Sequence, residues 1–150
     1  MNKNQILAWD NPRFRNWIAV FQAEKAVIKE LARVLVPFDL KIAQLDVLMN
    51  VYRHPGTSQH ELARRLLVGR SNITMALPDL ERQGLINRES DPKDKRVFRL
   101  SLTPKGEEKL MAALEVYTAL IDRVMAKSTP AECDAMGELM RRIAAELKDE

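Results

Sequence analysis

Apolar residues recur every three or four positions over most of the chain, which is the spacing of amphipathic helices. Residues 12–36 form the first such stripe, and Pro37 should end it because proline cannot continue a helix interior. A second helix is predicted between Asp39 and the turn at 54–56, and its inward residues are Ile42, Leu45, Leu48, Met49 and Tyr52. The first stripe comprises Trp17, Val20, Phe21, Glu24, Val27, Ile28, Leu31, Val34 and Leu35.

Two shorter helices are predicted in the middle of the chain. Ser58 and Glu61 have the spacing of a capping box, in which each side chain accepts a hydrogen bond from the other residue's backbone N–H. The helix that they start should bury Leu62, Ala63, Leu66 and Leu67. Gly69 interrupts the pattern, and a further helix should run from about 70 to 83, with Gly84 as its C-terminal cap.

The pattern then changes to that of two strands, at 85–90 and 97–102, around a polar turn at 91–96. In the second strand, Phe98, Leu100 and Leu102 alternate with polar positions. Thr103 followed by Pro104 is typical of a helix start, and the helix should extend to about Lys127.

A last helix is predicted from the capping box of Thr129 and Glu132, with Pro130 in its first turn. Its stripe comprises Met136, Leu139, Met140, Ile143 and Leu147. The predicted fold is therefore mainly α with a small β-hairpin, in the order α-α-α-α-β-β-α-α. Two short helices and a hairpin in this order indicate a winged helix-turn-helix, with the hairpin as the wing.

The length of 150 residues favours a single domain over 1–150. No apolar run approaches the ~20 residues of a membrane-spanning helix, and the first residues lack the pattern of a signal peptide. Cys133 is the one cysteine, which excludes an internal disulfide and favours the reducing cytoplasm.

Positive charge is concentrated in the middle of the chain. Residues 53–105 carry 11 Lys or Arg against 6 Asp or Glu, whereas the remainder carries 13 against 15. A mixed solvated surface would also tolerate this balance, but it suits a lobe that faces a polyanion.

The helix expected at 70–83 has two different faces. Ile73, Leu77 and Leu80 should pack inward. The opposite face presents Ser71, Met75, Pro78 and Arg82, flanked by Asn72, Thr74 and Asp79. Small polar side chains beside Arg70 and the free N–H groups of the first turn suit phosphates and base edges in a major groove. Pro78 removes one helical hydrogen bond, so we expect it to kink the helix or loosen its second half.

The hairpin tip combines Lys93, Lys95 and Arg96, a cationic cluster suited to a minor groove. Asp94 lies among these cations, and we expect it to pair with an arginine and hold the wing in shape.

These motifs together resemble the multiple-antibiotic-resistance regulator (MarR) family over nearly the whole chain. The likeness rests on the capping box at Ser58, the run from Arg70 to Thr74, and above all the wing pattern at 91–96 followed by Leu102, Thr103 and Gly106. The resemblance implies a dimer whose helices at 10–36 and 105–148 interlock, each subunit placing a winged helix of residues 40–104 on a pseudo-palindromic site. It also implies repression that a small aromatic acid or cysteine oxidation relieves.

Position by position, the resemblance implies that Asn72, Thr74 and Met75 face the groove, that Arg96 enters the minor groove and that Asp94 braces the wing. The whole expected DNA-binding set is Ser58, Gln59, Arg70, Ser71, Asn72, Thr74, Met75, Lys93, Lys95 and Arg96. The chain departs from the family's pattern in two places. Lys41 replaces a helix-opening threonine, which leaves Asp39 as the expected cap, and Pro78 and Asp79 replace Asp-Arg.

Several side chains allow a second role. Trp17, Phe21, Phe38, Tyr52 and Arg53 are candidates for a pocket that binds an aromatic acid, although aromatic residues on a stripe also serve as plain core. Cys133 lies in a first helical turn that favours a thiolate, but a structural thiol is the simpler interpretation. His54 and His60 lack neighbouring ligands at metal-binding spacing, so we expect no metal site and no cofactor.

The apolar stripes at both ends exceed what one winged helix must cover, which favours a homodimer. The leading hypothesis is a sequence-specific, ligand-responsive repressor that binds double-stranded DNA. A winged-helix protein-interaction module and a small-molecule binder that uses the interhelical cavity are the alternatives. No motif of a nucleotide-binding loop or a nucleophile elbow occurs, so we do not expect an enzyme.

Overall fold

The structure is a computed structural model that describes residues 6–67 and 71–148, with Ser71 and Asn72 described by their backbone alone. It divides into two compact units, residues 1–113 and 114–150. The first unit contains η1 (Ala8–Asp10), α1 (Phe14–Leu35), η2 (Val36–Phe38), α2 (Ile42–Arg53), β1 (Thr57–Ser58), α3 (Gln59–Arg65), α4 (Ser71–Arg82), β2 (Ile86–Ser90) and β3 (Phe98–Leu102). The helix α5 (Pro104–Met125) crosses from the first unit into the second, and α6 (Pro130–Glu146) belongs to the second.

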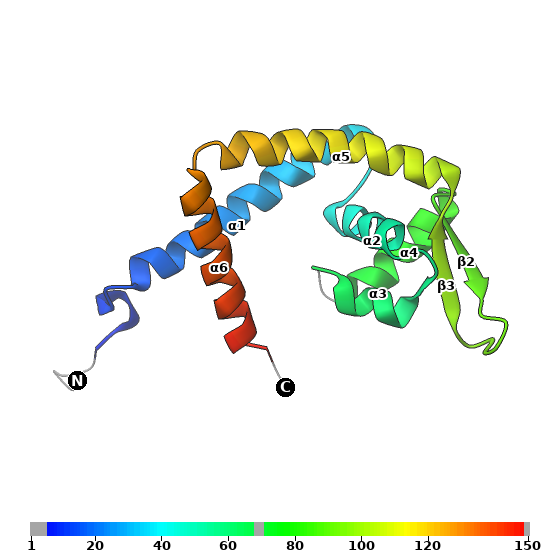
Figure 1. The fold of residues 1–150 in the computed structure, drawn as a ribbon, viewed down its shortest axis with the longest axis horizontal. Coiled ribbons are helices and arrows are strands. Elements are labelled where there is room, and N and C mark those ends of the chain that lie inside the picture. The colour runs from blue at the N-terminus through cyan, green and yellow to red at the C-terminus, as the bar shows by residue number, and fades with distance from the viewer. Residues whose placement is uncertain (1–5, 68–70, 149–150) are drawn as a thin grey trace. The chain divides into compact units, whose positions relative to one another are not determined.

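The core of the first unit lies where α2, α3 and α4 gather beside the hairpin (Figure 1). Leucines dominate it because their branched side chains fill the space between crossing helices in low-energy rotamers. The fully buried ones are Leu35, Leu45, Leu48, Leu62, Leu80, Leu85, Leu100 and Leu110. The mainly helical winged helix-turn-helix that the sequence predicts is thereby confirmed.

The sheet has three antiparallel strands in the order β1-β3-β2, one more than the sequence indicated. β2 and β3 form the predicted hairpin, in which Arg88 pairs with Leu100. The additional strand, β1, has two residues and pairs Thr57 with Leu100. Its partner lies more than forty positions along the chain, so no local pattern marks it.

Most helix ends follow local sequence rules. Gly84 adopts a φ of 72°, and the Leu85 N–H donates to the Leu80 carbonyl at 3.0 Å, which closes α4 as predicted. The Thr103 hydroxyl accepts from the Gly106 N–H at 2.9 Å at the start of α5. At the start of α6, Thr129 accepts from the Glu132 N–H at 3.2 Å. The reciprocal bond from the Thr129 N–H lowers the pKa of Glu132.

Three sequence expectations are wrong. The cap of α2 is Lys41, whose N–H donates to the Gln44 side chain at 2.9 Å, whereas Asp39 takes a left-handed φ of 51° at the end of η2. Tyr52 was expected to face inward but is 45% exposed, because Val51 occupies the buried position instead. Leu67 follows the end of α3 and is 88% exposed.

The long stripe of α1 is buried only at its C-terminal end. Leu31 and Leu35 are buried, whereas Trp17, Val20, Phe21, Val27 and Ile28 are exposed. In the second unit, α6 contains no buried residue, and its stripe residues Met136 and Leu139 are 50% and 44% exposed. These stripes are therefore only partly accounted for by packing within one chain.

Candidate nucleic-acid interface

The helix α4 buries one face and exposes the other, as predicted. Ile73, Leu77 and Leu80 are buried, which fixes the rotation of the helix about its axis. That rotation leaves Thr74 exposed and Met75 78% exposed on the outward face. Of the other residues expected to face a groove, Arg70 lies outside the described residues, and so do the side chains of Ser71 and Asn72.

The second half of α4 is attached to α2 by Asp79. One carboxylate oxygen accepts from the Gln44 amide at 2.6 Å and from the Gln83 amide at 2.8 Å, and the other accepts from Arg82 at 2.9 Å. The bonds from Gln44 and Gln83 lower the pKa of Asp79. Asp79 therefore links two helices, and its pair with the exposed Arg82 keeps it at the edge of the outward face.

Pro78 lies inside α4, and the helix is continuous from Ser71 to Arg82. Its ring is exposed, so it meets solvent rather than the core. The sequence predicted a kink or a loosened second half. The Asp79 bonds to α2 and the buried Leu80 hold that second half in place.

The capping box of α3 forms as predicted and takes up the side chain of Ser58. The Ser58 hydroxyl accepts from the Glu61 N–H at 3.1 Å, and the Ser58 N–H donates to Glu61 at 3.2 Å. The latter bond is the main cause of a lowered pKa at Glu61. Ser58 is 8% exposed, whereas Gln59 is half-buried and His60, which contacts Arg64, is exposed.

The turn after α3 is held by a buried carboxylate of α2. Asp46 is 4% exposed and accepts from the Leu67 N–H at 2.8 Å and from the Asn50 amide at 3.0 Å. This carboxylate sets where the chain leaves α3 on its way to α4.

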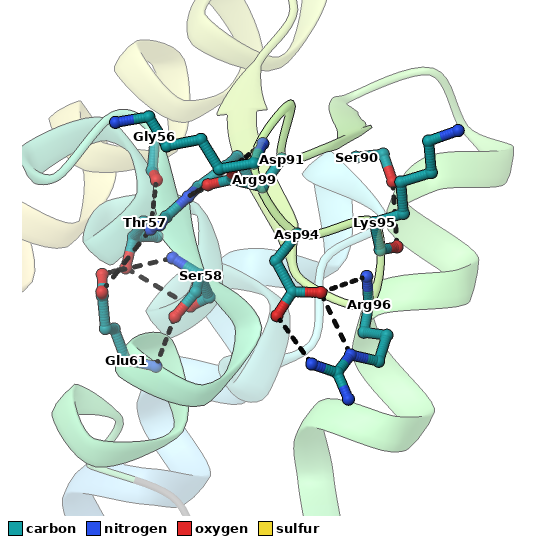
Figure 2. Close-up of polar contacts among 11 residues, drawn as sticks. Gly56, Thr57, Ser58, Glu61, Ser90, Asp91, Asp94, Lys95, Arg96 and Arg99 are labelled. Carbon is teal, nitrogen blue, oxygen red and sulfur yellow. Dashed lines mark hydrogen bonds and ion pairs between the residues drawn. The ribbon is translucent and has the colours of Figure 1, made fainter.

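The wing tip contains a pair between Asp94 and Arg96 (Figure 2). Asp94 Oδ1 accepts from the Arg96 backbone N–H and from Arg96 Nε, each at 3.1 Å, and Oδ2 accepts from Nη2 at 3.3 Å. These bonds lower the pKa of Asp94, the side-chain bonds more than the backbone one. The Arg96 side chain is 90% exposed, so it stays accessible while Asp94 holds its backbone and its guanidinium.

The remaining predicted cations of the tip are also exposed. Lys93 donates its backbone N–H to Asp91 at 2.8 Å, and the Lys95 carbonyl accepts from the Ser90 hydroxyl at 3.1 Å. The backbone of both lysines is thus held in the turn, and their ammonium groups are available to a polyanion.

Sequence reasoning missed Arg99 in β3. Its side chain contacts Asp91 at the base of the tip and Glu61 and Gly56 beside the start of α3 (Figure 2). The alternation of β3 places Arg99 on the face away from Leu100 and close to the turn at 91–96. This position is the one indication of its role that the sequence offers.

The proposed pocket residues are only partly brought together. The rings of Trp17 and Phe21 meet edge to face, with centroids 5.5 Å apart. Phe21 also borders a shallow hollow on α1 that is lined by Glu24, Lys25, Ile28 and Lys29. Phe38 is half-buried, and Tyr52 and Arg53 are exposed at the end of α2.

Within residues 6–67 and 71–148, no helix combines the length and apolar character that crossing a membrane requires. In the same part of the chain, no three His, Cys, Asp or Glu side chains form a group that could hold a metal ion.

A helix-turn-helix with an exposed outward face on α4, next to a cationic β-hairpin tip, defines a winged helix-turn-helix DNA-binding protein. A sequence profile of the MarR family matches residues 38–97. A relative from Bacillus subtilis (strain 168), the uncharacterised HTH-type transcriptional regulator YkoM, is 30% identical over 131 residues, or 87% of this chain and 85% of the relative.

Two solved structures are similar in both sequence and fold. The transcriptional repressor CouR, bound to a 23-mer DNA duplex, is 32% identical with a TM-score of 0.77, covering 84% of this chain and 89% of CouR. The crystal structure of MarR is 30% identical with a TM-score of 0.67, covering 91% of this chain and 97% of MarR. The chain belongs to the MarR family and is a DNA-binding transcription regulator.

Proposed function

We propose that this regulator is a sequence-specific, ligand-responsive repressor that acts in the cytoplasm as a homodimer on a pseudo-palindromic operator. It needs no cofactor and has no enzymatic activity. The observation that carries the proposal is that one lobe exposes two different DNA-suited surfaces. These are the outward face of α4, with Met75 78% exposed, and the wing tip, with the Arg96 side chain 90% exposed. A pure protein-interaction module has no need of both.

The outward face of α4 reads the major groove. Thr74 and Met75 face bases, and Arg70, Ser71 and Asn72 complete the contact at the first turn, where helix N–H groups favour phosphate oxygens. Gln59 and the start of α3, which Ser58 caps, contact the DNA backbone. These contacts set the register of the protein on the duplex. Lys93 and Lys95 bind phosphates beside the wing.

Arg96 enters the minor groove, where a guanidinium responds to groove width and negative potential. Asp94 braces the wing, because its bonds to the Arg96 backbone and Nε hold the arginine in place before DNA arrives. This arrangement lowers the ordering cost of binding.

The apolar stripes at both ends of the chain, at 10–36 and 105–148, form the dimer interface. Exposed apolar side chains recur at helical spacing on three helices, which is the pattern of intermolecular helix packing. They are Trp17, Val20, Phe21, Val27 and Ile28 on α1, Met111, Ile121 and Val124 on α5, and Met136 and Leu139 on α6.

A small aromatic acid is the proposed effector, bound by Trp17, Phe21, Phe38 and Tyr52, with Arg53 on its carboxylate. Supporting observations are the exposed Trp17–Phe21 ring pair and the exposure of Arg53. Calorimetric titration with salicylate tests it, and the absence of both heat and an effect on DNA affinity would remove the effector from the proposal.

Two substitutions separate the two surfaces. Arg96→Ala should weaken binding to a duplex selected by this protein and to a scrambled duplex alike, and should lower the salt slope by about one. Asn72→Ala should cost roughly 1–3 kcal/mol on the selected duplex and much less on the scrambled one, because it loses base contacts. Fluorescence anisotropy at several salt concentrations measures both effects.

Arg33→Ala is the matched control, because Arg33 is an exposed arginine on α1 that pairs with Glu30. It should leave affinity for both duplexes within about twofold. Equal binding by the wild type and by both site variants at moderate salt contradicts the DNA-reading proposal.

A further inference from the structure

Arg99 lies in β3, the central strand of the sheet. Of the two strands beside it, β1 leads into α3 and β2 leads into the wing tip. Its backbone pairs with Ser58 on β1 and with Glu89 on β2. Its side chain lies on the face opposite the buried Leu100 and is 41% exposed. The sheet therefore fixes the backbone of Arg99, and the guanidinium can contact side chains on either side of the strand.

The guanidinium of Arg99 contacts two separate parts of the lobe at once. Nε donates to Asp91 Oδ2 at 3.0 Å, and Asp91 is the first residue of the wing tip after the last paired position of β2. Nη1 lies 3.6 Å from Glu61 Oε1 and 3.5 Å from the Gly56 carbonyl oxygen, at the start of α3. Figure 2 shows Arg99 reaching from Asp91 toward Gly56 and Thr57.

Each anchor of Arg99 is itself fixed. Asp91 accepts from the Lys93 N–H at 2.8 Å, so its carboxylate holds the turn of the tip as well as the arginine. Its side chain is only 17% exposed, and its pKa is lowered by the Lys93 N–H and by Arg99. Glu61 is fixed by the capping box of Ser58. The chain of contacts thus runs from the tip turn through one guanidinium to the α3 cap.

We propose that Arg99 is a positioning residue that couples the wing to the start of α3, so that Arg96 is presented to the minor groove in register with the helix-turn-helix. The inference rests on the proposed minor-groove role of Arg96. Exposed ion pairs add little to folding stability because water screens them. The effect of this coupling falls on DNA binding, where a wing held in place loses less freedom on association.

A competing explanation is that Arg99 binds a phosphate directly. The two explanations predict opposite signs for Asp91→Asn. Asparagine keeps an oxygen for the Lys93 N–H but places an amide NH₂ where Oδ2 accepted from Arg99. Direct phosphate binding predicts tighter binding, because a negative charge is lost and Arg99 is released. Positioning predicts weaker binding despite the lost negative charge.

The experiment is a double-mutant cycle in the full-length chain, measured by fluorescence anisotropy on a duplex selected by the wild type from a random pool. Arg96→Ala should weaken binding by roughly tenfold in the wild-type background. In the Arg99→Gln background the same change should weaken it by less than about twofold, because the wing no longer presents Arg96. Asp91→Asn alone should weaken binding by roughly fivefold.

Lys105→Gln is the charge-matched control. Lys105 is exposed at the start of α5, and its ammonium donates to the Gln83 carbonyl at 3.0 Å, away from the tip. In this background Arg96→Ala should keep its full tenfold effect, within about twofold. An Arg96→Ala effect of equal size in the Arg99→Gln and Lys105→Gln backgrounds overturns the proposal, and so does tighter or unchanged binding by Asp91→Asn.

Hydrogen exchange in the free protein tests the coupling without DNA. The Asp91 N–H donates to the Val97 carbonyl at 2.8 Å, and the Val97 N–H donates to the Asp94 carbonyl at 3.0 Å. Both amides should exchange several-fold faster in Arg99→Gln and in Asp91→Asn than in the wild type. Unchanged exchange overturns the coupling itself. Faster exchange together with an Arg96→Ala variant that binds like the wild type refutes the minor-groove role instead, so the two failures are distinguishable.

Discussion

Single residues at the junction of the hairpin and α5 are fixed by backbone contacts. Thr103 donates its hydroxyl to the Gly84 carbonyl at 2.6 Å and its N–H to the Leu85 carbonyl at 3.0 Å. Gly106, one turn later, is buried directly against Leu85, and an added Cβ would overlap the Leu85 carbonyl oxygen. Backbone cannot move away as a flexible side chain can, so this glycine is required by packing.

Gly106→Ala should therefore lower the free energy of unfolding by about 1–3 kcal/mol through overpacking. Urea unfolding at a fixed protein concentration measures the change. Gly137→Ala on α6 is the control, because its Cβ would meet only the mobile Arg141 side chain. The control should be neutral or raise stability by up to about 1 kcal/mol. A Gly106→Ala variant as stable as the wild type would show that the backbone yields at this point.

At the scale of elements, α4 combines a helix-breaking residue with an attachment to α2. Pro78 has no N–H for the Thr74 carbonyl, yet the helix is continuous through it. Leu77 and Leu80 are buried on either side, and Asp79 bonds to Gln44 on α2. Tertiary contacts therefore keep the residues after Pro78 helical despite the local preference of proline.

Pro78→Ala should raise the free energy of unfolding by about 1–3 kcal/mol, because alanine restores the helical donor and removes the ring. Urea unfolding gives the value. Pro104→Ala is the control, because Pro104 is the first residue of α5, where proline is tolerated, and its effect should stay within about 0.5 kcal/mol. A loss of stability in Pro78→Ala would mean that the proline ring makes a packing contact of its own.

On the scale of the whole molecule, the exposed stripes are the observation behind the proposed homodimer. The second unit presents Met136 and Leu139 on α6 and Leu147 directly after it, with exposures of 50%, 44% and 68%. A single chain of this size has no reason to display such a row of apolar residues to water. The proposed homodimer covers this row. The helices at the chain ends then set the spacing between the two winged helices.

Leu139→Glu should raise the dissociation constant of the dimer more than about tenfold, because two-fold symmetry places the unpaired carboxylate in the interface twice. Sedimentation velocity over a concentration series measures it, and operator affinity should fall with it. Ala145→Glu adds the same charge on the opposite, exposed face of α6 and should leave the constant within about twofold. Equal constants for the two variants would remove α6 from the interface.

Local rules accounted for much of the fold and part of the candidate site. The caps at Ser58, Gly84, Thr103 and Thr129 were predicted correctly because each involves residues within a few positions of one another. The inward face of α4 was also predicted, since a buried stripe follows directly from helical periodicity.

Errors arose where a residue's partner is distant in the sequence. The bond that joins Asp79 to Gln44, thirty-five positions earlier, was not predicted. Tyr52 was expected inside, but Val51, the residue before it, is the one that tertiary packing buries. Asp39 is the exception, because its error is local: it ends η2 in a left-handed conformation, and Lys41 caps α2 with Gln44 instead.

The sequence by itself determined the order of the elements, the winged helix-turn-helix and the identity of the exposed cations at 93–96, because these depend on periodicity, capping and turn chemistry. The tertiary structure alone decided the third strand, the attachment of α4 to α2 and the position of Arg99 between the wing and α3. Each of these needs atoms from segments far apart in the chain to meet, and only the packing of the core brings them within hydrogen-bonding distance.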